Sequence, residues 1–363
     1  MAGILEQFCD GDPNSWIQEL ENDRKRKARS FDIVSVRTVM RSQIFGQDVA
    51  LEQILQTIDD TSQRSNRRKP LAVAMALGQP GSGKTDAFER LAAAMGIPLL
   101  IVPCNSIGSG EHNLIPWLGN SKGMAGGEDI GNIPDFLAKN PKGGIVLFDE
   151  IEKVLPNDKA PIAKAVMGLC EKGELTSRGD GQTYTAYNHI IAFTANLRQD
   201  EVTQELLTAL AAGPFMDEDN NLDWERIDDH TSRVKEIILG GDDKPGFSDA
   251  LLTRFTNVVV FEPLSTGAIA SIVVKSVVSV LAGSELILVE RGVDRALLKA
   301  ITNRALNVPK PNGRDTFLVA QKMVSKNLRS FKNGLKATGR DMDKVRVRVD
   351  LSPEGDSAII TEA

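Results

Sequence analysis

The chain has 363 residues, 41% of them hydrophobic, and its 43 basic and 49 acidic residues give a formal net charge of −6. This length allows one large buried core and a smaller second core, and the acidic balance argues against a general nucleic-acid-binding protein. No apolar run is long enough to cross a bilayer, and the N-terminus does not resemble a cleaved signal, so we expect a cytoplasmic protein without a membrane partner.

The first segment, residues 1–38, is expected to be a helical extension. A helix is predicted to begin near Asn14, and a basic run at residues 24–27 follows it. Because cations stabilise the C-terminal turn of a helix, the run is interpreted as a solvated helix end. A contact with an anionic partner or with another subunit is the alternative.

The next segment has the order of a strand, a glycine loop and a helix. An apolar run at residues 71–77 predicts a buried strand, and residues 86–95 have the spacing of an amphipathic helix. Between them lies the complete phosphate-loop pattern G-x-x-x-x-G-K-[ST], formed by Gly78, Gln79, Pro80, Gly81, Ser82, Gly83, Lys84 and Thr85. Glycines let the backbone curl around phosphate oxygens at a helix N-terminus, while the lysine reaches the β- and γ-phosphates and the Thr85 hydroxyl binds Mg²⁺. The pattern predicts a site for ATP and Mg²⁺; a plain glycine turn is the alternative.

Further short apolar runs lie at residues 98–102, 144–148, 189–194 and 258–261. Strands that alternate with helices indicate a largely parallel sheet with helices on both faces. The expected fold class is therefore α/β, with ligands bound at the C-terminal ends of the strands.

Two adjacent acids, Asp149 and Glu150, follow the strand predicted at residues 144–148. Asp149 is expected to hold Mg²⁺, and Glu150 to orient and deprotonate the water that attacks the γ-phosphate. An Asp-Glu pair alone is more often an exposed turn, but its combination with the phosphate loop predicts hydrolysis as well as binding.

Together these Walker A and Walker B motifs resemble those of the AAA+ ATPases, and specifically the C-terminal ATPase module of the Clp disaggregases and unfoldases. The resemblance covers about residues 40–350 and includes I-x-G-Q-D at residues 44–48 and D-E-[IV]-E-K at residues 149–153. It implies a P-loop AAA+ large domain at residues 39–264, with Phe45 near the adenine, and a smaller, mainly helical lid domain at residues 265–363.

The same resemblance implies three further site residues. Asn196 is the asparagine of the family's T-[SA]-N-L strand and would sense the γ-phosphate. Arg254 ends the string F-x-x-x-[FL]-[LI]-x-R and would be the arginine finger, acting on the γ-phosphate of a neighbouring subunit in a hexameric ring. Arg314 lies where the family has G-A-R and would be the sensor-2 arginine. A turn residue is the alternative for Asn196, and helix-end or loop cations are the alternatives for the two arginines.

Beyond residue 264 the pattern changes to helices, predicted at residues 267–281, 293–306 and 315–331. The alternating residues 345–349 predict a strand with one polar face. An acidic stretch at residues 216–229 is interpreted as a solvated loop inserted into the family pattern. A metal site is the alternative, but the stretch has no compact set of oxygen ligands with the spacing of a binding loop.

Residues 117–126 align with the loop that faces the central pore in Clp unfoldases, and Met124 takes the aromatic position. Methionine grips varied apolar side chains but lacks a rigid ring, so threading of a substrate protein is compatible with this loop. An inert surface loop is the alternative. No I-G-[FL] tripeptide is found, so no peptidase partner is expected.

Two functions follow from these motifs. The first is an ATP-hydrolysing ring that remodels or unfolds protein substrates. The second is a nucleotide-regulated assembly or scaffold ATPase, with slow hydrolysis and no threading, which Met124 favours. A helicase or clamp-loader role is disfavoured by the acidic balance.

Overall fold

A computed structural model describes residues 32–63, 68–106, 114–120, 129–154, 161–240, 246–337 and 345–363. Met124 and the basic run at residues 24–27 lie outside these ranges. The described chain divides into two compact units. Unit 1 comprises the described residues of Met1–Gln43, Val49–Gly78 and Lys84–Phe261, and unit 2 comprises those of Ile44–Asp48, Gln79–Gly83 and Glu262–Ala363.

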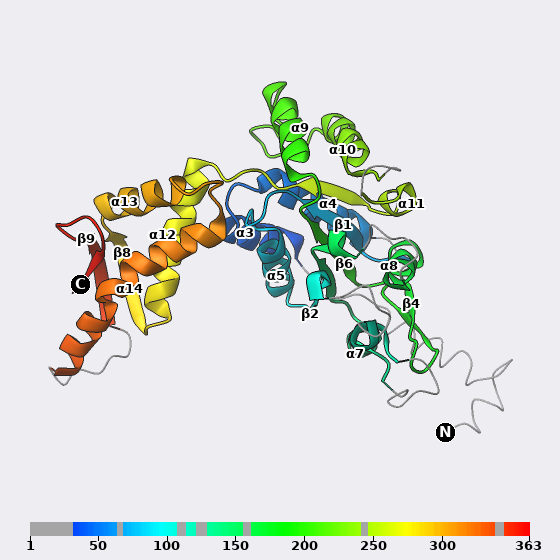
Figure 1. Cartoon of the computed structure of the whole chain (residues 1–363), viewed down its shortest axis with the longest axis horizontal. Coiled ribbons are helices and arrows are strands. Elements are labelled where there is room, and N and C mark those ends of the chain that lie inside the picture. Colours follow the sequence, from blue (N-terminus) through cyan, green and yellow to red (C-terminus); the bar gives the residue numbers. More distant parts are fainter. Residues whose placement is uncertain are drawn as a thin grey trace. The chain divides into compact units, whose positions relative to one another are not determined.

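Unit 1 is built on a five-stranded sheet with the order β2-β3-β6-β1-β7 (Figure 1). Its strands are β1 (Ala72–Leu77), β2 (Leu99–Pro103), β3 (Ile145–Asp149), β6 (Ile190–Ala195) and β7 (Asn257–Val260). All neighbouring pairs in this sheet are parallel. The two strands β1 and β6 are buried at every residue, as strands covered on both faces must be. The predicted parallel α/β sheet is confirmed.

Helices and a small hairpin surround this sheet. The α-helices are α3 (Ile33–Gln43), α4 (Asp48–Ser62), α5 (Lys84–Met95), α6 (Ile115–Leu118), α7 (Asn132–Lys139), α8 (Pro161–Lys172), α9 (Gln199–Ala211), α10 (Trp224–Ile238) and α11 (Asp249–Leu252). The described part of the unit also contains the 3-10 helices η1 (Cys104–Ser106) and η3 (Ile151–Lys153) and the antiparallel strands β4 (Glu174–Thr176) and β5 (Thr183–Thr185). None of the described helices is long and apolar enough to cross a membrane.

The acidic stretch at residues 216–229 is not wholly a loop, which corrects the prediction. Helix α10 begins at Trp224, and the Asp223 side chain caps it by accepting a hydrogen bond from the Arg226 backbone N–H at 3.2 Å. An aspartate at this position satisfies an otherwise free N–H of the first turn, so the acidic composition is compatible with a helix start.

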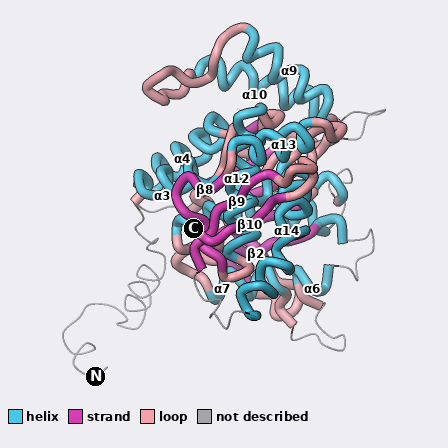
Figure 2. The backbone as a smooth tube through the Cα atoms, turned by 90° about the vertical axis from the view of Figure 1, so that its left-hand side faces the viewer, coloured by secondary structure: helices cyan, strands magenta, loops and turns pink. Residues whose placement is uncertain are grey.

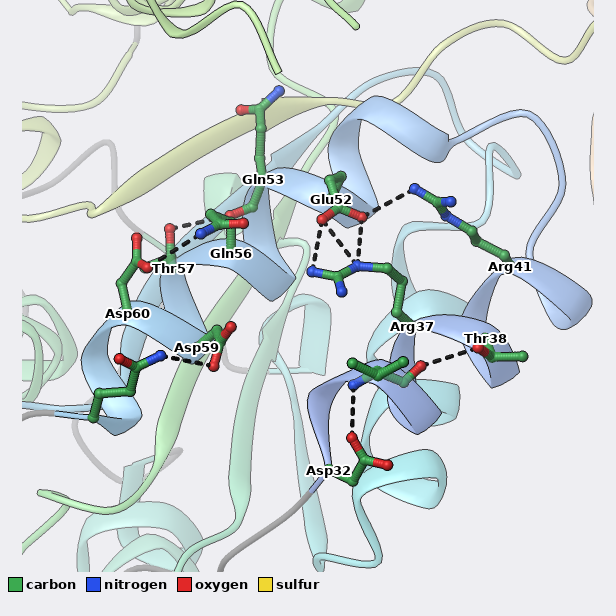
Figure 3. Close-up of polar contacts among 12 residues, drawn as sticks. Asp32, Arg37, Thr38, Arg41, Glu52, Gln53, Gln56, Thr57, Asp59 and Asp60 are labelled. Carbon is green, nitrogen blue, oxygen red and sulfur yellow. Dashed lines mark hydrogen bonds and ion pairs between the residues drawn. The ribbon is translucent and has the colours of Figure 1, made fainter. Parts of the chain in front are cut away.

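Helix α3 is fixed to α4 by an ion-pair network around one buried carboxylate (Figure 3). Arg37 Nη2 lies 2.9 Å from Glu52 Oε1, and Arg41 Nη2 lies 3.1 Å from Glu52 Oε2. A buried carboxylate needs such partners, because an unpaired charge in the interior is costly. Glu52 therefore connects these two helices.

Three aromatic rings form a continuous part of the unit 1 core. The ring of Phe148 on β3 stacks on Phe193 of β6, with centroids 5.2 Å apart, and Phe193 meets the ring of Phe255 edge to face, also at 5.2 Å. Both arrangements are favourable for aromatic rings. The core thus connects the end of β3 to the segment after α11.

Unit 2 contains three long helices and a three-stranded sheet with the order β10-β9-β8. The helices are α12 (Thr266–Ala282), α13 (Arg295–Leu306) and α14 (Gly313–Ala337), and the strands are β8 (Leu286–Val293), β9 (Val345–Leu351) and β10 (Ala358–Glu362). Figure 2 shows these strands in magenta and the helices in cyan. Strand β9 pairs parallel with β8 and antiparallel with β10. The three helices and strand β9 were predicted, whereas β8 and β10 were not.

Candidate functional site

The first residue of α5, Lys84, lies at the centre of a hydrogen-bonded cluster in unit 1. Its Nζ donates to the Gly78 carbonyl and to Asn196 Oδ1, both at 2.9 Å. The residue is only 7% exposed. Lys84 therefore joins the start of the phosphate loop to the end of β6, where the sensor asparagine was predicted.

The carboxylate of Asp149 is held at the end of β3 by two hydroxyl groups. Thr85 Oγ1 donates to Asp149 Oδ1 at 2.8 Å, and Thr194 Oγ1 donates to the same oxygen at 2.6 Å. The backbone N–H of Glu150 in turn donates to Thr194 Oγ1 at 2.9 Å. The structure thus brings together the predicted metal ligands and fixes the backbone of the predicted catalytic glutamate.

Glu150 has a left-handed backbone, with φ 57° and ψ 50°. Residues other than glycine rarely adopt this conformation, which costs about 1–3 kcal/mol and is found at functional sites. The bond from its N–H to Thr194 helps to hold the conformation. The local geometry turns the chain sharply between β3 and η3.

A second acid of the same segment, Glu152, contacts the sensor position. Asn196 Nδ2 donates to Glu152 Oε1 at 3.3 Å, and Glu152 Oε2 is buried with no hydrogen-bond partner among the described residues. Burial raises the pKa of Glu152. Sequence reasoning gave roles neither to Glu152, although it belongs to the D-E-[IV]-E-K string, nor to Thr194.

The electrostatics of the cluster are dominated by burial of the ammonium group. Burial lowers the pKa of Lys84 to about 8, while the carboxylates of Glu152, Asp149 and Glu150 partly oppose this shift by favouring the charged form. A buried lysine with a lowered pKa binds its proton more firmly when further negative charge arrives. The cluster is therefore electrostatically suited to a phosphate ligand.

The middle of the phosphate loop, Gln79–Gly83, makes its contacts within unit 2. The buried amide of Gln47 donates to the Ser82 carbonyl at 3.3 Å and to the Glu262 carbonyl at 3.0 Å, and it accepts from the Glu262 N–H at 2.8 Å. The I-x-G-Q-D string therefore includes a residue that braces the loop backbone.

Phe45 and Arg314 also lie in unit 2. The Phe45 ring is half-buried and lies 5.9 Å from Lys275 Nζ. The N–H of Gly313 donates to the Gly81 carbonyl at 2.9 Å, so α14 begins against the loop, and the exposed Arg314 is the next residue. Contact of Phe45 with adenine and of Arg314 with phosphate stay predictions.

The loop and its neighbours fit Mg²⁺ and a nucleoside triphosphate. Gly81 and Gly83 have φ of +76° and +100°, which favour glycine, and a Cβ added at Gly83 would meet no atom within 4 Å. Ser82 Oγ is buried without a hydrogen-bond partner among the described residues. Thr85 and Asp149 supply hard oxygen ligands, and Mg²⁺ at phosphate sites needs only one or two from the protein.

Arg254 makes its described contacts apart from the Lys84 cluster. Its Nη2 lies 2.7 Å from Glu171 Oε2 at the end of α8, and its Nη1 donates to the Ala250 carbonyl. The structure therefore does not join Arg254 to the other predicted site residues of its own chain. A finger that acts on a neighbouring subunit would show this arrangement.

The family model described as "AAA domain (Cdc48 subfamily)" matches residues 69–257. The chain belongs to this AAA family. It is 24% identical over 276 residues to the mitochondrial chaperone protein ClpB4 of Arabidopsis thaliana, covering 75% of this chain and 26% of the relative. It is 26% identical over 251 residues to heat shock protein 104 of Schizosaccharomyces pombe, covering 68% and 25%. The chain thus spans about a quarter of the length of these relatives.

A solved structure has the same fold. It is described as a closed-state cryo-electron-microscopy reconstruction of Hsp104 with ATPγS and FITC casein, and it is similar to this AAA chain with a TM-score of 0.66 and 19% identity. The similarity covers 90% of this chain and 51% of the other. The predicted resemblance to Clp-type ATPase modules is confirmed, together with the AAA+ fold that it implied.

Proposed function

We propose that this AAA chain hydrolyses ATP as a module of a Clp-type ring that remodels or unfolds protein substrates. The observation that supports it best is the bonded set of Thr85, Asp149, Thr194 and Glu150, which fixes a hydroxyl and a carboxylate for Mg²⁺ beside the candidate general base. A merely structural turn would have no need of a strained glutamate at this position.

In this proposal each residue has a defined task. The loop glycines and Lys84 bind the phosphates, and Thr85 with Asp149 holds Mg²⁺, which would neutralise charge on the phosphate oxygens. Glu150 accepts a proton from the attacking water. Asn196, which is already within hydrogen-bond distance of Lys84, orients that water and detects the γ-phosphate.

The larger assembly is also proposed. Resemblance to the Clp rings supports a hexamer in which Arg254 reaches the neighbouring subunit's γ-phosphate, whereas Arg314 in the lid responds to the nucleotide bound by its own subunit. A protein is the proposed substrate, because a relative of this chain is named a chaperone and the solved structure with the same fold includes casein. Met124 would contact the substrate. Neither a peptidase nor a nucleic acid is proposed as a partner, and the cytoplasmic location stays a prediction.

The deciding experiment measures ATPase rate per subunit against protein concentration. Wild type should gain specific activity as rings form, and Arg254→Ala should lose at least about 10³-fold of it while still binding ATP. Glu150→Gln is the control that binds ATP but does not hydrolyse it. Activity that is flat with concentration and indifferent to Arg254 would contradict the ring with a shared site.

A second measurement on the same proteins, the unfolding of a substrate protein, distinguishes the remodelling ring from the scaffold. A remodelling ring couples hydrolysis to unfolding of a tagged substrate protein, whereas a scaffold assembles with ATP and shows no such coupling. Assembly without unfolding, across several substrate proteins, would favour the scaffold.

A further inference from the structure

The guanidinium of Arg254 is held along one edge by a single carboxylate. Arg254 Nη2 and Nε lie 2.7 Å and 3.2 Å from Glu171 Oε2, and Nη1 donates to the Ala250 carbonyl. The Arg254 side chain is 24% exposed and that of Glu171 is 51% exposed. The pairing lies at the surface of unit 1, between the end of α8 and the residue two beyond α11.

These bonds leave part of the guanidinium available. An arginine has five N–H donors in a planar fork. The described contacts use one donor each on Nε, Nη1 and Nη2, so one N–H on each of the two terminal nitrogens remains. The end of the guanidinium formed by Nη1 and Nη2 is its outer edge, and each of these two nitrogens keeps one N–H that can donate to a phosphate. Glu171 therefore orients the arginine without occupying the edge that would meet a phosphate.

The backbone beneath this side chain is fixed by the core. The N–H of Arg254 donates to the Leu251 carbonyl at 3.0 Å. The following residue, Phe255, is 5% exposed and lies edge to face against Phe193 of β6. With the backbone fixed, the direction of the long side chain depends on Glu171 and the Ala250 carbonyl.

We propose that Glu171 is a positioning residue for Arg254, holding its outer edge toward the nucleotide site of the neighbouring subunit. The inference rests on the proposed function, since it assumes that Arg254 acts in trans. The ion pair and hydrogen bond with Arg254 lower the pKa of Glu171, so the carboxylate stays ionised at neutral pH. Without it the guanidinium samples several rotamers, and loss of orientation is costly in rate.

The first test uses mixed rings to separate the two sides of the shared site. Arg254→Ala subunits keep a complete site without a finger, and Glu150→Gln subunits keep the finger without hydrolysis, so their mixture should hydrolyse ATP. Replacing the second partner by the double variant Glu150→Gln/Glu171→Ala should lower kcat of the mixture about tenfold with KM unchanged. Glu171→Gln in place of Glu171→Ala keeps one acceptor oxygen, so the mixture should regain part of the lost kcat.

Two controls fix the interpretation. The ion pair between Asp135 and Lys139, 2.7 Å apart on α7, is also at the surface, so Asp135→Asn in the Glu150→Gln partner should leave the mixture unchanged. Placing Glu171→Ala in the Arg254→Ala partner should also leave it unchanged, because that subunit supplies no finger.

The second test needs neither nucleotide nor activity. The ¹⁵N–¹H signal of Arg254 Nε, assigned by its absence in Arg254→Lys, should exchange slowly with solvent in the wild type. In Glu171→Ala it should exchange at least about fivefold faster, since the hydrogen bond that protects it is removed.

The outcomes distinguish the two proposals. If Arg254→Ala keeps full activity alone, the trans finger fails and the proposed function fails with it. If Arg254→Ala is inactive but the double variant rescues it as well as Glu150→Gln does, or Nε exchange is unchanged, the positioning role of Glu171 is wrong and the ring proposal stands. If kcat falls equally whether Glu171→Ala is in the Arg254→Ala partner or in the Glu150→Gln partner, the positioning role of Glu171 is also wrong.

Discussion

Lys84 shows how one buried residue prepares the site for a polyanion. Its ammonium is surrounded by a carbonyl and an amide oxygen, and burial lowers its pKa to about 8. A lowered lysine pKa means that the free protein releases this proton as the pH rises through about 8, well below the usual value of 10.5. Phosphate charge nearby would favour the ammonium and raise the pKa again.

This shift predicts a pH dependence of nucleotide binding. From pH 7 to pH 9 the dissociation constant for Mg²⁺-ATP should rise about tenfold, because at pH 9 the free protein must first take up a proton at Lys84. Isothermal titration calorimetry in buffers with different ionisation enthalpies should show that proton uptake near pH 9 and little of it near pH 7.

The matched control is Lys84→Arg, since arginine does not deprotonate in this range. Its affinity, even if weaker, should be flat between pH 7 and pH 9. The same slope in this variant and in the wild type would show that another group is responsible.

At the scale of elements, the pairing of β3 with β6 builds the end of the sheet that carries the candidate catalytic residues. The register sets Phe148 opposite Phe193, so the next residues along the strands, Asp149 and Thr194, are brought together. Thr194 is 2% exposed and bonds both to the Asp149 carboxylate and to the Glu150 N–H. A single hydroxyl therefore connects the candidate metal ligand to the candidate general base.

Thr194→Val keeps the shape of the side chain and removes that hydroxyl. The Glu150 N–H loses its acceptor, so the free energy of unfolding should fall by about 1–3 kcal/mol. We expect kcat to fall about 10- to 100-fold with ATP affinity little changed, because the left-handed Glu150 loses a support. Denaturant titration measures the loss of stability, and steady-state kinetics measure the loss of kcat. Thr194→Ser, which keeps the hydroxyl, should retain most of the stability and most of the activity of the wild type. A variant as active as wild type would exclude this role.

The sequence predicted those elements whose signal is local. The apolar run before the phosphate loop and the helix after it were found because burial on both faces and a helix N-terminus leave clear patterns. Strand β8 was missed because its pattern is interrupted by Glu290 and Arg291, both exposed. The contacts of Thr194 and Glu152 depend on which strands are neighbours in the sheet. No single stretch of sequence predicts the strand order, so these two residues were missed.

At the scale of the whole molecule, the two units are not contiguous in sequence. Residues 44–48 and 79–83 make their contacts with unit 2, although each lies between segments of unit 1. The resemblance implied domains that are continuous stretches, and their boundaries at residues 38 and 264 stay proposals. Gln47 illustrates this division, because its side chain hydrogen-bonds to the backbones of Ser82 and Glu262, which belong to the same unit although they are far apart in sequence.

The remodelling proposal makes its clearest whole-molecule prediction at Met124. If the ring threads protein through its pore, each ATP hydrolysed moves substrate only when the pore loop grips it. Met124→Ala should therefore lower the number of tagged fluorescent protein molecules unfolded per ATP about tenfold or more, since a methyl group offers little surface to grip. Met124→Tyr should raise this ratio, because an aromatic ring is larger and more rigid. Loss of fluorescence and phosphate release, measured together, give the ratio directly. Equal ratios in both variants would indicate that this loop takes no part in threading, and they would favour a ring that assembles around its partner.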